Sequence, residues 1–335
     1  MVAQGPLRRP RHPRCLRGGR TVSLRRVAAV DCGTNSIRLL VADLDPATGH
    51  LVELDRRMEI VRLGQDVDRT GRLAPEALDR TFAACRQYAE VIRSLGAEHT
   101  RFVATSASRD AENRDEFTAG VVSILGVEPE VITGDAEAEF SFTGATRELA
   151  ESGLATPYLV VDIGGGSTEV VVGTDGVEAA RSVDIGCVRL TERHLVHDGK
   201  VADPPTADQV AKIRADINAA LDLAEETVPL SRARTLVGLA GSVTTVAAIH
   251  LGLPEYNSAA IHHSRVPLAD VRGLTTRLLN STHAERAAIP VMHPGRVDVI
   301  ATGALILQSI MERVSATEVV VSEHDILDGI AWSQV

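Results

Sequence analysis

Residues 30–38 read VDCGTNSIR, and residues 161–169 repeat the pattern as VDIGGGSTE. In each stretch an apolar segment ends in Asp, the chain turns through Gly and small hydroxyl residues, and a second apolar segment begins. Because Gly has no side chain, its backbone N–H group can approach an anion closely, and the Asp is placed to hold a divalent cation beside that anion. The repeat therefore predicts two similar halves that hold a phosphate chain from both sides of a cleft.

The bulk composition is typical of a soluble globular protein large enough for two domains. The 335 residues are 44% hydrophobic and 24% charged. The sequence contains no run of 18 consecutive apolar residues, so we predict neither a transmembrane helix nor a membrane partner. The cysteines lie far apart without CxxC spacing, which favours a reduced, cytoplasmic setting over a disulfide framework or a zinc site. They are Cys15, Cys32, Cys85 and Cys187.

Charge is distributed unevenly along the chain. Residues 1–26 contain eight Arg and no acid, so the remainder holds 27 of the 35 Lys and Arg residues against 45 acids. We expect residues 1–26 to be a disordered basic extension, although a transit peptide or a nucleic-acid-binding arm would have a similar composition. Because the remainder is strongly acidic, it would repel nucleic acid, and we expect no stable nucleic-acid partner. A polyanionic ligand would have to be held by a local site.

Hydrophobic periodicity and turn residues predict an α/β protein in which one run of elements occurs twice. The first half is expected to contain strands at 27–32, 37–44, 51–62, 101–105 and 128–133, with helices at 75–95, 113–125 and 135–150. The second half is expected to contain strands at 158–163, 168–174, 177–184, 234–239 and 317–321, with helices at 188–197, 206–228, from 242, 267–280, 283–288, 296–314 and at the end. This division predicts domains at 27–143 and 144–335, because each half opens with the same three-strand meander.

The two repeated turns differ in how strongly they predict phosphate binding. An ordinary tight hairpin explains the first turn equally well, but three consecutive glycines weaken a hairpin, so the second turn needs another reason. Because the turns recur in register, we expect both to bind phosphate. The predicted phosphate-binding residues are Gly33, Thr34, Asn35 and Ser36 in the first turn and Gly164, Gly165, Gly166, Ser167 and Thr168 in the second.

Arg38 and Glu169 occupy equivalent positions, seven residues after Asp31 and Asp162. We expect each to point to the same side of its sheet as its Asp, although a solvent-facing strand residue is the simpler interpretation. A carboxylate beside bound phosphate is repulsive unless it holds metal or moves a proton. Glu169 is therefore the more informative of the two residues.

Other strand ends carry weaker signals. Arg109 follows a strand and precedes a helix, where an anion would be favoured, and Glu137 lies in a first helical turn, where acids commonly complement the helix dipole. The Gly-Ser turn at 241–242 fits either a phosphate site or a plain strand–helix corner. For the histidines of the second half (His250, His262, His263 and His283), we expect surface or core positions and no metal site.

As a set, these motifs resemble the exopolyphosphatase/guanosine pentaphosphate phosphohydrolase (Ppx/GppA) family. DxGTNS, ATSAxRxAxN, GxxEA, VDIGGGSTE and GSVTT occur here in the family order, from about residue 27 to the C-terminus. The resemblance implies an α/β fold of two actin-like, ribonuclease-H-like domains with an interdomain cleft. It also implies the short form of the family, because the chain ends where longer members continue into a helical C-terminal domain.

The resemblance implies release of a terminal phosphate from linear polyphosphate, or of the 5′-terminal phosphate from pppGpp. Glu137 would be the general base that activates water, and Glu169 would help hold that water or a Mg²⁺ ion (or another divalent cation). The metal would lie near Asp31 and Asp162. Phosphate oxygens would be held by Arg109, Asn35, Ser36, Gly165, Gly166 and Ser167.

Two departures from the family pattern matter. Ala136 stands where the family often has a second acid, which leaves Glu137 as the sole candidate base in that motif. The absent C-terminal domain leads us to expect short polyphosphate chains as substrate.

The alternatives are a pppGpp phosphohydrolase, an actin-like ATP-binding scaffold and a sugar kinase. Glu137 and Glu169 disfavour the scaffold, and the chain shows no substrate-binding insertion of the usual kinase type. Related proteins are often dimers, which leaves a homodimer open.

Overall fold

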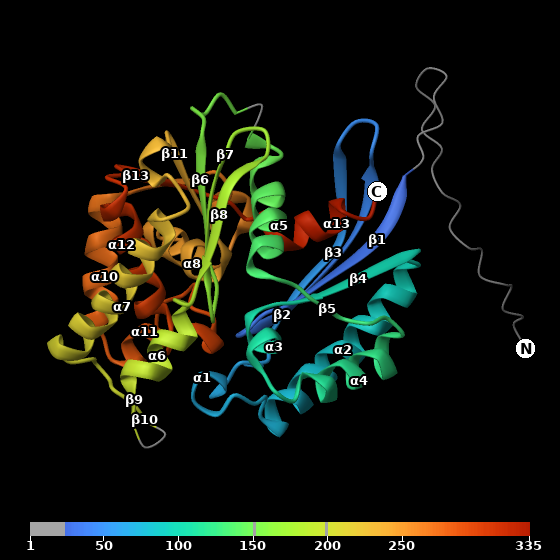
Figure 1. Ribbon diagram of the computed structural model, residues 1–335, viewed down its shortest axis with the longest axis horizontal. Helices are drawn as coiled ribbons and strands as arrows, with labels where there is room; N and C mark the ends of the chain where they lie inside the picture. Colours follow the sequence, from blue (N-terminus) through green and yellow to red (C-terminus); the bar gives the residue numbers. More distant parts are fainter. Residues whose placement is uncertain (1–23, 150–151, 198–199) are drawn as a thin grey trace, which may run out of the picture.

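The computed structural model describes residues 24–149, 152–197 and 200–335 (Figure 1). Most of the expected basic extension, residues 1–23, lies outside this part of the chain. Its last two residues, Arg25 and Arg26, begin the first strand instead, where the Arg26 guanidinium donates to Asp43 at 2.7 Å.

The first half is a five-stranded sheet of order β3-β2-β1-β4-β5. Its strands are β1 (Arg25–Cys32), β2 (Ser36–Asp45), β3 (His50–Ile60), β4 (His99–Ala104) and β5 (Glu130–Val131). The first three form an antiparallel meander, and β4 and β5 run parallel to β1. Helices α2 (Pro75–Leu95) and α4 (Arg114–Leu125) cover one face, where Tyr88, Phe102 and Phe117 are buried.

The second half repeats this topology in a six-stranded sheet of order β12-β13-β11-β6-β7-β8. Its strands are β6 (Tyr158–Ile163), β7 (Thr168–Gly173), β8 (Val177–Val183), β11 (Thr235–Leu239), β12 (Arg265–Pro267) and β13 (Glu318–Val321). An antiparallel meander of β6, β7 and β8 adjoins β11 and β13, which run parallel to β6. The additional strand β12 closes the edge antiparallel to β13.

Helices surround the second sheet and form the largest core of the protein. They are α6 (Cys187–Leu195), α7 (Ala207–Glu225), α8 (Ala240–His250), α10 (Leu268–Asn280) and α12 (Ile300–Arg313). Short elements complete the second half: β9 (Val196–His197), β10 (Lys200–Val201), α9 (Ser258–Ile261), α11 (His283–Ala287) and the 3₁₀ turns η2 (Leu230–Arg232) and η3 (Pro294–Arg296). The first half contains two further short helices, α1 (Val67–Thr70) and α3 (Ser106–Asp110). The shared strand order confirms the predicted α/β fold of two actin-like halves.

Two helices cross between the sheets, and each packs against the sheet of the other half of the chain. Helix α5 (Gly134–Thr146) packs against the second sheet, and the final helix α13 (Ile326–Trp332) packs against the first (Figure 1). The helices touch at two glycines: a Cβ on Gly144 would lie 1.9 Å from the Asp325 carbonyl oxygen, and one on Gly329 would lie 2.1 Å from that of Phe140. The predicted boundary at 143/144 therefore falls inside α5, and the last helix packs with the first half.

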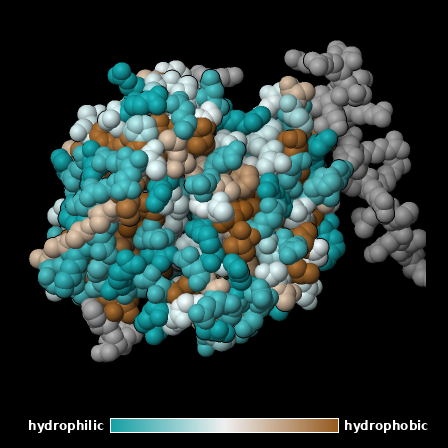
Figure 2. Space-filling model, viewed as in Figure 1, coloured by the Kyte–Doolittle hydropathy of each residue, from teal (hydrophilic) through white to brown (hydrophobic). Residues whose placement is uncertain are grey.

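The surface in the orientation of Figure 2 is largely hydrophilic, with hydrophobic residues in separate small patches. Within the described ranges, no helix is both long enough and apolar enough to cross a bilayer.

Candidate active site

The two repeated turns have the same backbone geometry. Gly33 donates its N–H to the Ser36 carbonyl at 2.9 Å, and Gly164 donates to the Ser167 carbonyl at 3.1 Å. Each turn joins the first two strands of its sheet, so both lie at the same edge of equivalent meanders. The fold brings these edges together, and the turns face each other across the interface between the halves.

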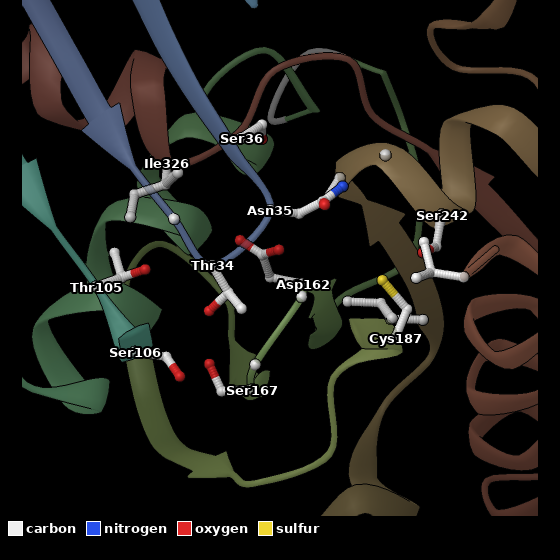
Figure 3. A pocket seen from close by; sticks show the side chains of 18 of the residues that line it. Thr34, Asn35, Ser36, Thr105, Ser106, Asp162, Ser167, Cys187, Ser242 and Ile326 are labelled. Atoms are coloured by element: carbon white, nitrogen blue, oxygen red, sulfur yellow. The ribbon is translucent and has the colours of Figure 1, made fainter. Parts of the chain in front are cut away.

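Gly166 is required by this close approach, and Gly165 is tightly packed against the first turn. A Cβ on Gly166 would lie 2.4 Å from the Ser106 hydroxyl and 2.6 Å from that of Thr34, and one on Gly165 would lie 3.1 Å from the Thr34 Cβ. In Figure 3 the hydroxyl groups of Ser106 and Ser167 point toward each other from opposite halves. The triglycine segment thus lets the halves close, in addition to exposing backbone N–H groups.

A cavity of about 90 Å³ lies between the turns. From the sequence-predicted set it is lined by Asp31, Gly33, Thr34, Asn35, Ser36, Glu137, Asp162, Gly164, Gly165, Gly166 and Ser167. A second cavity of about 660 Å³ adjoins it and shares Arg38, Gly241 and Arg296 with it. The small cavity suits a single charged group, whereas the large one has room for a larger moiety.

Three predicted residues do not line the small cavity. The Thr168 hydroxyl donates to the Ile185 carbonyl inside the second half, and Glu169 is 1% exposed behind the cavity wall. Arg109 donates to the Ile132 carbonyl at 2.9 Å and to the Glu137 carboxylate at 3.3 Å. Arg109 is therefore placed beside the predicted base, and its contact with phosphate stays a prediction.

The register of the two meanders confirms the equivalence of Arg38 and Glu169. Asp31 pairs directly with Arg38 across β1 and β2, and Asp162 pairs with Glu169 across β6 and β7. Cross-strand partners project from the same face of a sheet, so each residue lies beside its Asp. One half thus places a cation next to its turn Asp, and the other places a second acid there.

Arg38 is not a free cation that faces the cleft. Its guanidinium donates to Asp31 at 2.6 Å and also to Asp325, the N-cap of α13. The C-terminal helix is therefore linked to the first turn through the chain Asp325–Arg38–Asp31. This contact could not be predicted from the sequence, because it joins residues 287 positions apart.

Four acids, Asp31, Glu137, Asp162 and Glu169, are buried around the cavity. Burial raises the pKa of Asp31, against the effect of the Arg38 charge. Burial raises the pKa of Glu137 to about 8, with Asp162 and Asp31 adding to the rise and Arg109 opposing it. Burial raises the pKa of Asp162 to about 6, although the Ser141 hydroxyl, at 2.6 Å, favours the charged form. The pKa of Glu169 is raised by burial and by the charges of Glu137 and Asp162. Such a group of mutually repelling carboxylates is typical of a site that holds a cation or moves a proton.

Several residues that line the cavity are not among the site residues predicted from the sequence. Thr105 and Ser106 follow β4 and begin α3, Ser242 comes from the start of α8, and Cys187 from the start of α6 (Figure 3). Arg296 also lines the cavity and donates to the Thr245 hydroxyl at 3.1 Å. Strand ends that open into helices were a usable signal for the first three, whereas Arg296 lies in a 3₁₀ turn that periodicity does not reveal.

The residues around the small cavity fit a divalent cation. The Asp31 Oδ1 and Thr34 Oγ1 atoms are buried and have no hydrogen-bond partner among the described residues. Carboxylate and hydroxyl oxygens are the donors that Mg²⁺ prefers, and an unpartnered buried oxygen is costly without a ligand. Asp31 and Asp162 both line the cavity, and Glu169 lies beside Asp162 as its cross-strand partner.

A separate group of potential ligands lies away from this cavity. Glu148, His262 and His324 have ligand atoms within 4.8 Å of one another, and the His262 ring stacks on His263. The His262 Nδ1 atom accepts the Glu323 N–H at 3.1 Å, so in the neutral ring the proton is on Nε2, which faces Glu148 at 3.3 Å. This arrangement fits a hydrogen-bonded cluster better than a metal site. His250 and His283 are paired elsewhere, with Asp270 and Asp298.

Comparison with known proteins identifies the family of the chain. The model of the Ppx/GppA phosphatase family matches residues 41–335. The chain belongs to the Ppx/GppA phosphatase family. It is 51% identical over 323 residues to exopolyphosphatase 2 of Mycobacterium tuberculosis, which covers 93% of this chain and 99% of that protein.

Solved structures of the Ppx/GppA family share the fold. The crystal structure of an exopolyphosphatase-like protein has a TM-score of 0.87 and 43% identity, covering 92% of this chain and 98% of that one. The Ppx/GppA enzyme of Aquifex aeolicus has a TM-score of 0.75 and 30% identity, covering 92% of this chain and 99% of the other. These similarities extend over both halves of the chain.

Proposed function

We propose that this chain is an exopolyphosphatase that releases terminal orthophosphate from linear polyphosphate by attack of water. The observation that carries the proposal is the buried Glu137 carboxylate on the wall of a small cavity between two phosphate-type turns. The high identity to a protein named exopolyphosphatase 2 supports the same activity.

In the proposed mechanism the two turns hold the terminal phosphate. The backbone N–H groups and hydroxyls of residues 34–36 would approach it from the first half, and those of residues 165–167 from the second, because the Gly33 and Gly164 N–H groups are used inside their own turns. Phosphoanhydride hydrolysis requires mainly positioning and charge neutralisation, so preorganised donors of this kind supply much of the rate enhancement.

Glu137 takes a proton from the attacking water in this mechanism. It lies in the first turn of α5, anchored by the Thr133 side chain, which accepts the Ala136 N–H. Arg109 beside it favours the ionised form that a base must have, against the effect of burial. The nearby Glu169 would orient the same water or a cation.

Because the residues around the cavity fit a divalent cation, three acids have a proposed role as its ligands. Asp31, Asp162 and Glu169 would hold the ion. A bound Mg²⁺ would neutralise charge on the phosphate oxygens and favour the ionised forms of the surrounding acids.

Hydrolysis of pppGpp is the second candidate activity, and one observation favours it. The larger cavity, of about 660 Å³, begins at Arg38, Gly241 and Arg296 and is lined by Tyr256 and Met292. It has both the room and the apolar side chains that a nucleoside would need beyond the reacting phosphate.

A comparison of three substrates tests the proposal. Phosphate release from short polyphosphate, long polyphosphate and pppGpp is measured with and without Mg²⁺, and kcat/KM is compared. We expect short polyphosphate to give the highest value and the activity to require the cation. A higher kcat/KM for pppGpp would assign the second function, and no release from any of the three would overturn both.

A further inference from the structure

Ser182 on β8 lies directly behind the two predicted catalytic glutamates. It pairs with Glu169 across β7 and β8, and its hydroxyl donates to the Glu169 Oε1 atom at 2.7 Å. Because Glu169 is 1% exposed, this hydrogen bond to a buried carboxylate fixes both the position and the rotamer of the side chain. Glu169 thus lies between two cross-strand partners, Ser182 on β8 and Asp162 on β6.

The same serine also sets the position of helix α5. Gly134 is the first residue of this helix, and a Cβ on it would lie 2.3 Å from the Ser182 Cβ and 2.9 Å from its hydroxyl oxygen. The backbone of Gly134 is outside the left-handed region, so glycine is needed here for space alone. The N-terminus of α5 thus rests on Ser182 without an intervening side chain.

Glu137 lies one helical turn from this contact, at position i+3 of α5. Side chains three residues apart lie on the same side of a helix, so a shift of Gly134 away from β8 would carry Glu137 with it. One residue, Ser182, therefore touches the helix that carries one glutamate and the carboxylate of the other.

We propose that Ser182 is a positioning residue that fixes the separation of Glu137 and Glu169. Its hydroxyl hydrogen-bonds to Glu169, and its Cβ packs against the backbone of Gly134 and so sets the position of α5. The inference rests on the proposed function, in which these two glutamates act on the same water. A merely structural contact between α5 and β8 would change stability and leave the turnover rate intact.

Four variants separate the two contacts. Ser182→Ala removes the hydroxyl and keeps the Cβ, Ser182→Gly removes both, Gly134→Ala creates the clash, and Gly134→Ala with Ser182→Gly removes the clash again. The measurements are kcat and KM for short polyphosphate, with thermal midpoints to confirm folding.

For Ser182→Ala we expect kcat to fall by roughly tenfold or more with KM changed less than about threefold, because a misplaced catalytic group affects the chemical step. Gly134→Ala should lower kcat by up to about 100-fold. The double variant should return to the kcat of Ser182→Gly, since the clashing atoms are gone. A double variant whose losses multiply contradicts the spacing role, and full kcat in Ser182→Ala contradicts the hydroxyl's role.

Parallel measurements on wild type and Glu137→Gln distinguish failure of this inference from failure of the proposed function. An active wild type, an inactive Glu137→Gln and fully active Ser182 variants would overturn only the positioning role. A wild-type chain that hydrolyses no phosphoanhydride would overturn both.

Discussion

Arg189 on α6 connects the two halves on the side of the cleft opposite the helix crossing. Its guanidinium donates to Asp110 at 2.6 Å and to Asp68, both in the first half, and to the Gly166 carbonyl of the second turn at 2.7 Å. Helices α1, α3 and α6, which carry these residues, lie together at the bottom of Figure 1, away from α5 and α13. We therefore predict that Arg189→Met weakens the closed arrangement of the halves.

The stability lost in Arg189→Met can be worked out from the solvent exposure of the side chains in its ion pairs. The Arg189 side chain is 12% exposed, whereas Asp68 and Asp110 are 27% and 36% exposed, so each ion pair is partly screened. At about 1 kcal/mol for each of these two pairs, their loss amounts to about 2 kcal/mol, or roughly a 30-fold change in the ratio of closed to open forms. At about 2 °C per kcal/mol, the thermal midpoint should fall by roughly 4 °C.

The assay is thermal unfolding combined with solution scattering. Arg313→Met is the matched control, because Arg313 also contacts two carboxylates, Asp222 at 2.7 Å and Glu225 at 2.9 Å, but both belong to the second half. We expect a larger radius of gyration for Arg189→Met and an unchanged one for Arg313→Met. Equal radii and equal midpoints for the two variants would refute the role of Arg189 in closure.

Three further predictions concern other contacts. Gly166→Ala should separate the two turns and lower kcat/KM by at least about tenfold, because its Cβ would meet the Ser106 hydroxyl at 2.4 Å; kinetics on short polyphosphate would show it. Gly144→Ala should lower the free energy of unfolding by about 1–3 kcal/mol or more, since the clashing atom is a backbone oxygen of Asp325; denaturant titration measures this, and an unchanged midpoint would contradict the crossing. His262 is neutral when folded, because burial and the adjacent His263 and His324 lower its pKa from 6.5 to about 4. The unfolded chain binds this proton first, so stability should fall as pH drops from 6.5 to 4, and it should fall less in His262→Gln.

The parts of the fold that depend on local sequence were predictable. Helix α2 begins at Pro75 and ends before Gly96, whose φ of 69° favours glycine, and these are the predicted bounds. The paired meanders and the facing turns followed from the repeated pattern. The sequence also indicated that Ser182 and Glu169 lie on neighbouring strands, because the predicted strands at 168–174 and 177–184 form one hairpin.

Contacts between distant segments could not be predicted from this one sequence. The crossing of α5 and α13 depends on Gly144 and Gly329, which are 185 positions apart and have no local feature that marks a close approach. The helix expected at 296–314 begins only at Ile300, because a 3₁₀ turn over Pro294–Arg296 precedes it and directs Arg296 toward the cavity. Strand β12 is three residues long, too short to produce a recognisable alternation.

The candidate site was predicted in composition but not in layout. The acids and glycines were recognised by type, and most of them line one cavity. Which of them line the cavity depends on packing: Glu169 is buried beside Asp162 and does not line the cavity, and Arg109 is paired with Glu137. Burial of a particular side chain follows from the packing of both halves, so the pattern of one turn could not predict it.

The central claim is that Glu137 activates the attacking water, and one pair of variants tests it most directly. Glu137→Gln keeps the size of the side chain and removes the base, whereas Glu139→Gln makes the same change at an exposed position of the same helix. With short polyphosphate and Mg²⁺ at saturation, kcat should fall by about 10²–10⁴-fold for Glu137→Gln and stay within about twofold for Glu139→Gln. A folded Glu137→Gln variant that retains kcat within about tenfold of wild type would contradict the account.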